Sequence, residues 1–273
     1  ILFAMNRITS IFESLRGSDG RALMPYVTAG DPDLATTSGL LRAAEAGGAS
    51  ICEVGVPFSD PIADGPVIEA SMSRALDGGT KVDDVMAMIR TLRPESQLGL
   101  VAMLSYSIVH RRGPAKFAAQ AAEAGFDGLI IPDLPVEESD AMVDHAREQG
   151  LALSFLIAPT SPLPRVRQLA AASSGFVYLL ARAGITGEQA EIAGDLSDRL
   201  AAVREATDLP IAVGFGVSTR DHVRQVVREA GADAAIVGSA IMRRVAELRE
   251  APRYDLVRKV GQFISELATG LTQ

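Results

Sequence analysis

The chain has 273 residues, of which 48% are hydrophobic and 22% are charged, and its formal net charge is −8. These proportions are typical of a soluble globular protein. An acidic chain without clusters of lysine and arginine is not expected to bind nucleic acid, because phosphate backbones attract concentrated positive charge. No apolar run reaches the roughly 18 residues that a membrane-spanning helix requires, so we expect no membrane interaction either.

The single cysteine, Cys52, lies in an apolar run, where it is most simply a small core residue. One cysteine excludes a disulfide framework and favours a reducing compartment, so we expect a cytoplasmic protein. Residues 1–4 precede Met5, and we interpret them as an extension from expression or from the gene start. Residues 5–273 contain no linker or shift in composition, and we expect them to form a single catalytic domain.

Helical segments that end in glycine and are followed by short apolar runs repeat along the chain. Runs of Ile, Val and Leu without alternation are typical of parallel strands buried on both faces. In chain order, strands are expected at 22–28, within 43–57, at 98–104, within 121–133, within 147–159, at 176–180, at 210–213 and within 228–240. Helices are expected between them, for example at 33–46, 114–124, 136–148, 164–172, 196–207 and 219–230.

Eight strands that alternate with helices favour an α/β fold, specifically a single closed (β/α)8 TIM barrel. An open doubly wound sheet is the alternative, but no G-x-G-x-x-G motif follows the first strand. We also expect an additional helix before the first strand and a short helix after the eighth. Such barrels place their chemistry at the carboxyl ends of the strands.

The segment EVGVPFSDPIADGP (53–66) carries three acidic residues at the end of the second expected strand. A buried carboxylate is costly, so Glu53 is expected to have either a partner or a chemical role. Glu53 could instead be a salt-bridged core acid. Asp60 and Asp64 could simply stabilise turns, because Asp before Pro or Gly is common in turns.

Two glycine-rich turns follow the seventh and eighth expected strands, GFGVS (214–218) and GSA (238–240). Glycine allows backbone N–H groups to approach an anion closely, and a helix N-terminus adds a favourable dipole. Each turn could also be a tight connection without a ligand. Two of them at the strands where barrels usually hold phosphate favour a phosphate site.

The lysines and histidines of the chain argue against two kinds of catalytic site. A Schiff base requires a lysine at a strand, but the three lysines are expected in helices or at their edges: Lys81, Lys116 and Lys259. A metal centre requires clustered ligands, and the histidines are separate, so no metal is expected: His110, His145 and His222. The catalytic chemistry that these residues leave open is proton transfer by Glu53 and Asp64.

Three tyrosines lie at or near the ends of expected strands, and with Phe215 they could line a flat apolar pocket: Tyr26, Tyr106 and Tyr178. Individually, each tyrosine is more simply interpreted as a core residue. Their shared position at the strand ends is what favours a pocket.

Six segments resemble the tryptophan synthase alpha subunit family: PYVTAGDP (25–32), EVGVPFSDPIADGPVIEAS (53–71), PDLPVEES (132–139), YLLARAGITG (178–187), VGFGVS (213–218) and IVGSA (236–240). The resemblance extends from Met5 to the C-terminal helix. It implies a barrel enzyme of tryptophan biosynthesis, a carbon–carbon lyase that cleaves indole-3-glycerol phosphate to indole and glyceraldehyde 3-phosphate. It also implies no cofactor in this chain, and a beta subunit partner that carries PLP in an α2β2 heterotetramer.

The resemblance implies that Glu53 transfers protons and that Asp64 accepts the indole N–H. By the same match, phosphate is bound by Gly187, Phe215, Gly216, Gly238 and Ser239. The indole pocket is assigned to Tyr26, Leu104, Tyr106, Ile130, Leu156 and Tyr178. A mobile lid would span 182–194 and include Arg182 and Thr186, and the partner contact would include Asp60, Pro61 and Ile108.

Ile108 departs from the resemblance, because the family usually has an asparagine at that position. Two alternatives remain open from the sequence. One is a non-catalytic partner that only activates a PLP-dependent beta subunit. The other is a different phosphate-binding barrel enzyme such as an indole-glycerol phosphate synthase, although that chemistry would need lysines at the strand ends.

Overall fold

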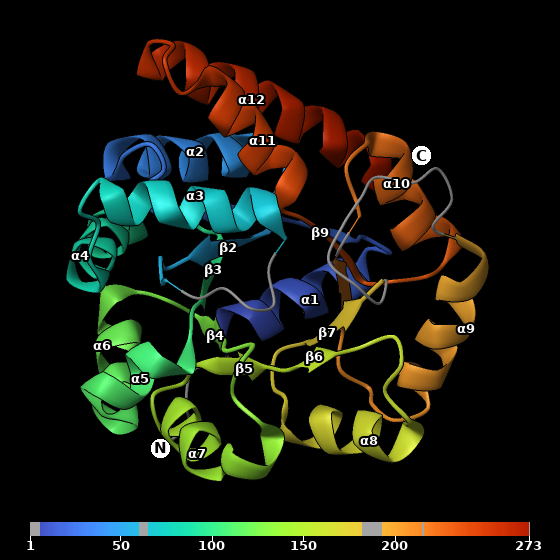
Figure 1. Cartoon of the computed structure of the whole chain (residues 1–273). Coiled ribbons are helices and arrows are strands. Elements are labelled where there is room, and N and C mark those ends of the chain that lie inside the picture. The colour runs from blue at the N-terminus through green and yellow to red at the C-terminus, as the bar shows by residue number, and fades with distance from the viewer. Residues whose placement is uncertain (1–5, 60–64, 182–192, 215, 273) are drawn as a thin grey trace.

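The protein is described by a computed structural model that covers residues 6–59, 65–181, 193–214 and 216–272 (Figure 1). Its strands are β1 (Ala22–Thr28), β2 (Ile51–Gly55), β3 (Gly99–Met103), β4 (Gly128–Ile130), β5 (Ala152–Ser154), β6 (Leu156–Ile157), β7 (Val177–Leu180), β8 (Ile211–Gly214) and β9 (Ala234–Val237). They pair in the order β5-β4-β3-β2-β1-β9-β8-β7-β6, and all pairs are parallel. The first and last strands therefore pair with each other, as in a barrel.

The fifth expected strand is divided into β5 and β6, which are separated by Phe155 alone. The Phe155 N–H donates to Ser173 Oγ at 3.1 Å, while its carbonyl accepts from the Tyr178 N–H at 3.1 Å. A serine side chain has thus replaced one bond of the strand ladder. Because β5 pairs with β4 and β6 pairs with β7, the two pieces together act as one strand that closes the barrel. The expected (β/α)8 barrel is confirmed.

Helices surround the sheet (Figure 1). The α-helices are α1 (Arg7–Gly17), α2 (Leu34–Ala46), α3 (Pro66–Asp77), α4 (Val82–Leu92), α5 (Tyr106–Arg112), α6 (Pro114–Ala124), α7 (Asp140–Glu148), α8 (Leu163–Ala172), α9 (Ala193–Arg204), α10 (Arg220–Arg224), α11 (Ser239–Leu248) and α12 (Arg253–Ala268). The shorter turns are the 3-10 segments η1 (Arg93–Glu95), η2 (Val136–Glu138) and η4 (Thr269–Leu271), and the π-helical segment η3 (Gln225–Glu229). Among the described residues, no helix combines the length and apolar character needed to cross a membrane.

Two expected helices are interrupted. The helix expected at 136–148 is divided into η2 and α7 at Ser139, whose hydroxyl donates to the Val136 carbonyl at 2.8 Å. The helix expected at 219–230 begins as α10 and continues as the π-helical segment η3. By contrast, the helix expected at 114–124 is α6, with Gly125 in the left-handed conformation after it.

The additional N-terminal helix, α1, closes the amino end of the barrel. Ile8 is fully buried, and Cβ atoms placed on Gly99 and Gly128 would lie 3.4 Å and 2.8 Å from its side chain. Asn6 caps the helix and also donates to the Asp127 carbonyl at 2.7 Å, just before β4. Substrate access is therefore expected from the opposite, carboxyl end, where the short helix α11 follows β9 as expected.

Candidate active site

Glu53 lies within β2 and is only 1% exposed. Its Cα is in register with Tyr26 of β1 and Val101 of β3, and residues paired in this way project from the same face of a sheet. Cys52 projects to the other face, where its thiol donates to the Pro25 carbonyl at 3.1 Å. Burial, followed by the negative charge of Glu53, raises the pKa of this thiol, so Cys52 is a neutral core residue as expected.

Two tyrosines lie over glycines of the neighbouring strands. A Cβ on Gly55 would be 2.0 Å from Tyr26 Oη, and a Cβ on Gly214 would be 2.2 Å from Tyr178 Oη. Gly55 lies two residues beyond the register partner of Tyr26, and Gly214 lies two beyond that of Tyr178. Both rings therefore lean toward the carboxyl end of the barrel, and only glycine at the facing position leaves room for them.

The two glycine turns follow neighbouring strands, β8 and β9. Gly216 has a φ of 84°, in the left-handed region that favours glycine. Gly238 is the N-cap residue of α11, and no side chain caps that helix. A Cβ on Gly238 would lie 3.4 Å from Tyr26 Cβ. The N-terminus of α11, which begins at Ser239, is thus beside Tyr26 and suited to an anion.

The other apolar residues assigned to the pocket lie either within strands or just after β3. Ile130 is in register with Met103 and lies on the inward face, while Leu156 is the half-buried register partner of Tyr178. Leu104 is fully buried and directly follows β3, whereas Tyr106 is the first residue of α5 and is half-buried. Their proximity to the strand ends agrees with a pocket, and contact with a ligand remains a prediction.

Several assigned residues lie outside the described residues: Asp60, Pro61, Asp64, Arg182, Thr186, Gly187 and Phe215. Ile108 is described, and it lies on α5, half-buried against the core. The second carboxylate, the lid and part of the phosphate and partner sites therefore remain predictions from sequence.

Asp133 is a residue of this region that the sequence analysis did not single out. Its carboxylate accepts from Ser105 Oγ at 2.6 Å and from the Tyr106 N–H at 2.7 Å. An acid that follows β4 thus caps α5, the helix that follows β3. Asp beside proline is common in turns, so the residue types alone do not reveal this cap.

The lysines have the positions expected of them. Lys81 is the N-cap residue of α4, Lys116 lies in α6 and Lys259 lies in α12, so none belongs to a strand. A Schiff base at the barrel interior therefore has no candidate lysine. Within the described part of the chain, no three or more His, Cys, Asp or Glu side chains are grouped so that they could hold a metal ion.

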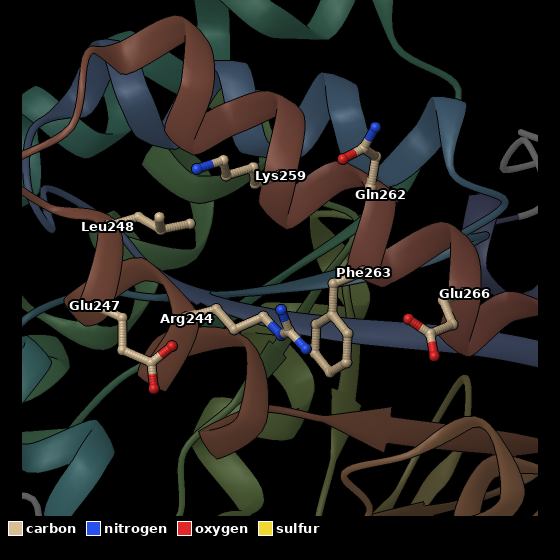
Figure 2. Close-up of a pocket in the computed structure, with 7 residues that line it drawn as sticks. All are labelled: Arg244, Glu247, Leu248, Lys259, Gln262, Phe263 and Glu266. Carbon is tan, nitrogen blue, oxygen red and sulfur yellow. The ribbon is translucent and has the colours of Figure 1, made fainter.

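A groove on the outer layer of helices does not belong to this site (Figure 2). In it the Arg244 guanidinium lies 4.0 Å from the centre of the Phe263 ring. All its lining residues come from α11 and α12: Arg244, Glu247, Leu248, Lys259, Gln262, Phe263 and Glu266. Since no strand contributes to it, the groove is separate from the barrel interior.

Sequence and structure comparisons identify related proteins. The sequence model of the family described as "Tryptophan synthase alpha chain" matches residues 12–271. The tryptophan synthase alpha chain of Acaryochloris marina is 45% identical over 243 residues, which cover 89% of this chain and 91% of that protein.

Solved structures of tryptophan synthases agree with the sequence matches. A structure of Mycobacterium tuberculosis tryptophan synthase has a TM-score of 0.88 at 32% identity and covers 99% of this chain and 100% of that chain. A chain of the tryptophan synthase complex from Pyrococcus furiosus has a TM-score of 0.81 at 33% identity, with 92% and 99% covered. The chain belongs to the tryptophan synthase alpha chain family.

Proposed function

We propose that this chain is a carbon–carbon lyase of tryptophan biosynthesis that cleaves indole-3-glycerol phosphate to indole and glyceraldehyde 3-phosphate. The observation that carries the proposal is the position of Tyr26. It is in register with the buried acid Glu53 and also lies against Gly238 at the N-terminus of α11. A buried acid, an aromatic ring and a glycine turn at a helix N-terminus are therefore close together, which suits a substrate with an aromatic ring and a phosphate.

In the proposed mechanism, Glu53 donates a proton to C3 of the indole and removes the proton of the glycerol hydroxyl at the adjoining carbon. Protonation at C3 leaves a positive charge on the ring, and Asp64 accepts the indole N–H and stabilises that charge. The bond between C3 and the glycerol carbon then breaks. Its electron pair restores the aromatic ring, and the glycerol carbon becomes the aldehyde of glyceraldehyde 3-phosphate. The indole ring itself supplies the electron sink.

The proposed phosphate site combines Gly216, Gly238 and Ser239 with two residues outside the described part of the chain, Gly187 and Phe215. Uncapped N–H groups at the start of α11 can donate to phosphate oxygens, and the helix dipole favours their negative charge. This arrangement needs no basic cluster, in agreement with the acidic composition.

We further propose that the chain acts as one catalytic domain and binds a tryptophan synthase beta subunit in an α2β2 complex. The solved structure of a tryptophan synthase complex from Pyrococcus furiosus supports a partner. The cofactor PLP would be held by the beta subunit and not by this chain. A cytoplasmic location is proposed from the single, buried free thiol of Cys52.

Neither alternative function is favoured. A different phosphate-binding barrel such as an indole-glycerol phosphate synthase would need a lysine at a strand end, and the three lysines lie in helices or at a helix cap. A non-catalytic partner would have no reason to retain a fully buried glutamate on the inward face of β2, because such a carboxylate is costly.

The test is the rate of indole formation from indole-3-glycerol phosphate by the purified chain and by Glu53→Gln. We expect the substitution to lower kcat by about 10²- to 10⁴-fold, because it removes a positioned acid and base without changing the size of the side chain. The matched control is Glu123→Gln on α6, whose side chain is 75% exposed. Turnover near wild type in Glu53→Gln would contradict the assignment, as would the absence of indole with the unaltered chain.

A further inference from the structure

A chain of buried hydroxyl groups leads from Tyr26 to α3. Tyr26 Oη lies 3.2 Å from Thr28 Oγ1, and Thr28 Oγ1 lies 2.6 Å from Ser71 Oγ. The Ser71 hydroxyl donates to the Ile68 carbonyl at 2.7 Å. Because the Ser71 proton is used toward Ile68, Ser71 Oγ is able to accept from Thr28, and Thr28 Oγ1 is in turn able to accept from Tyr26. These hydroxyl groups thus connect the Tyr26 side chain to α3.

A part-buried ion pair lies one helical turn further along α3. Arg74 donates from Nε and Nη2 to the two carboxylate oxygens of Asp31, at 3.0 Å and 2.7 Å. Asp31 is 1% exposed, and its hydrogen bond raises the pKa of Arg74. A bidentate pair of this kind fixes orientation as well as charge. Close by, a Cβ on Gly30 would lie 2.1 Å from Thr80 Oγ1, so the chain after β1 also packs against the turn after α3.

These contacts attach both elements that flank the β2–α3 connection to β1 or to the residues just after it. At one end β2 pairs directly with β1, and Glu53 is in register with Tyr26. On the other side of the connection, Ser71 in the middle of α3 and Arg74 in its last turn attach that helix to Thr28 and Asp31, at and just after the end of β1. The connection itself contains Asp64, the second acid of the proposed mechanism. Strand β1 therefore carries Tyr26, pairs with the strand that carries Glu53, and contacts α3, the helix that follows Asp64 in the sequence.

We propose that Ser71 and Arg74 are positioning residues of the reaction, which hold Tyr26 and α3 in place relative to Glu53. The inference rests on the function proposed above. Neither residue is assigned a contact with substrate. Neither Ser71 nor Arg74 belongs to the phosphate turns, which follow β8 and β9, so loss of either residue should slow the chemical step more than it weakens substrate binding.

The test uses the full chain with Ser71→Ala, Arg74→Lys and, as a matched control, Arg93→Lys. Arg93 also forms a part-buried ion pair, with Asp127 at 3.0 Å through one hydrogen bond, but at the amino end of β4. We expect Ser71→Ala and Arg74→Lys to lower kcat by about 10- to 100-fold and to change KM by less than about threefold. Arg93→Lys should lower the Tm to a similar degree while its kcat stays within about twofold of wild type.

A second measurement separates positioning from stability. In a Tyr26→Phe background the hydroxyl chain has lost its first member, so Ser71→Ala should have much less additional effect on kcat. If Arg74→Lys does not fold, the neutral pair Asp31→Asn/Arg74→Gln replaces it, with the same expected loss of kcat. Wild-type kcat in the folded variants, an equal loss in Arg93→Lys, or additive effects of the tyrosine and serine changes would overturn the proposal. Absence of indole with the unaltered chain would overturn the proposed function instead.

Discussion

Replacement of Gly55 by alanine should displace Tyr26 and damage the candidate site. The added Cβ would lie 2.0 Å from Tyr26 Oη, 2.6 Å from Cζ and 2.9 Å from Cε2. All three distances are shorter than carbon makes with non-bonded atoms, so the ring must move. Tyr26 is only 3% exposed, and the Gly238 turn lies on its other side, so the ring cannot move freely.

The cost has two parts. Overpacking in a well-packed interior typically costs about 1–3 kcal/mol. Displacement of the ring also breaks the hydrogen bond between Tyr26 and Thr28, which is worth about 0.5–1.5 kcal/mol. Together they predict that Gly55→Ala lowers the free energy of unfolding by about 2–4 kcal/mol. For a chain of this size that corresponds to a decrease in Tm of roughly 5–15 °C.

The assay is thermal unfolding followed by circular dichroism, together with kcat for indole formation. Gly17→Ala is the control, because nothing lies within 4 Å of an added Cβ there. Tyr26→Phe in the Gly55→Ala background should recover part of the lost stability, since it removes the closest atom but leaves Cζ in place. A Tm of Gly55→Ala within about 1 °C of wild type would show that the ring does not lie over Gly55.

Gly216→Asp should raise KM for the phosphorylated substrate at least about tenfold through charge repulsion, and an unchanged KM would place the phosphate elsewhere. Burial alone would raise the pKa of Asp33, but hydrogen bonds from Thr36 and Arg253 outweigh it and lower the pKa overall. The Asp33 carboxylate therefore contributes to stability above about pH 4, and this contribution is lost as the pH falls through the lowered pKa. The free energies of unfolding of wild type and Asp33→Asn, measured with urea, should therefore converge in acid. A difference that stays constant with pH would refute this. Ile108→Asn should strengthen binding to a beta subunit of the common type about tenfold in calorimetric titration, because it supplies amide hydrogen bonds; no gain would remove Ile108 from the interface.

Strand and helix positions were predictable wherever the local pattern alone determines them. The apolar run 22–28 is β1, and the helix expected at 114–124 is α6, bounded by glycine on both sides. The divided fifth strand was not predictable, because the bond that interrupts it comes from Ser173, at the end of the following helix. A sequence pattern indicates which secondary structure a segment prefers. It does not indicate which distant side chain will form a hydrogen bond with that segment's backbone.

The same limit applies to the candidate site. The alternation of strands and helices predicts Glu53, Tyr26 and Tyr178 at or near strand ends, and the structure places each of them two residues before the carboxyl end of its strand. The attachment of β1 to α3 does not follow, because Thr28 and Ser71 are 43 residues apart and read separately as a strand end and a helix residue. Only the packing of α3 on the end of β1 brings their hydroxyls together.

Acidic residues near strand ends in this barrel have different roles, and position alone does not distinguish them. Asp133 follows β4, is only half-buried, and uses both carboxylate oxygens to cap α5. Glu53 lies within β2, is almost completely buried, and projects inward level with a tyrosine that also borders the N-terminus of α11. A cap satisfies its carboxylate with backbone and hydroxyl donors at the surface and needs no access to the interior. A catalytic acid must face the space that the substrate occupies, so inward orientation and burial are what favour Glu53 for proton transfer and Asp133 for support of α5.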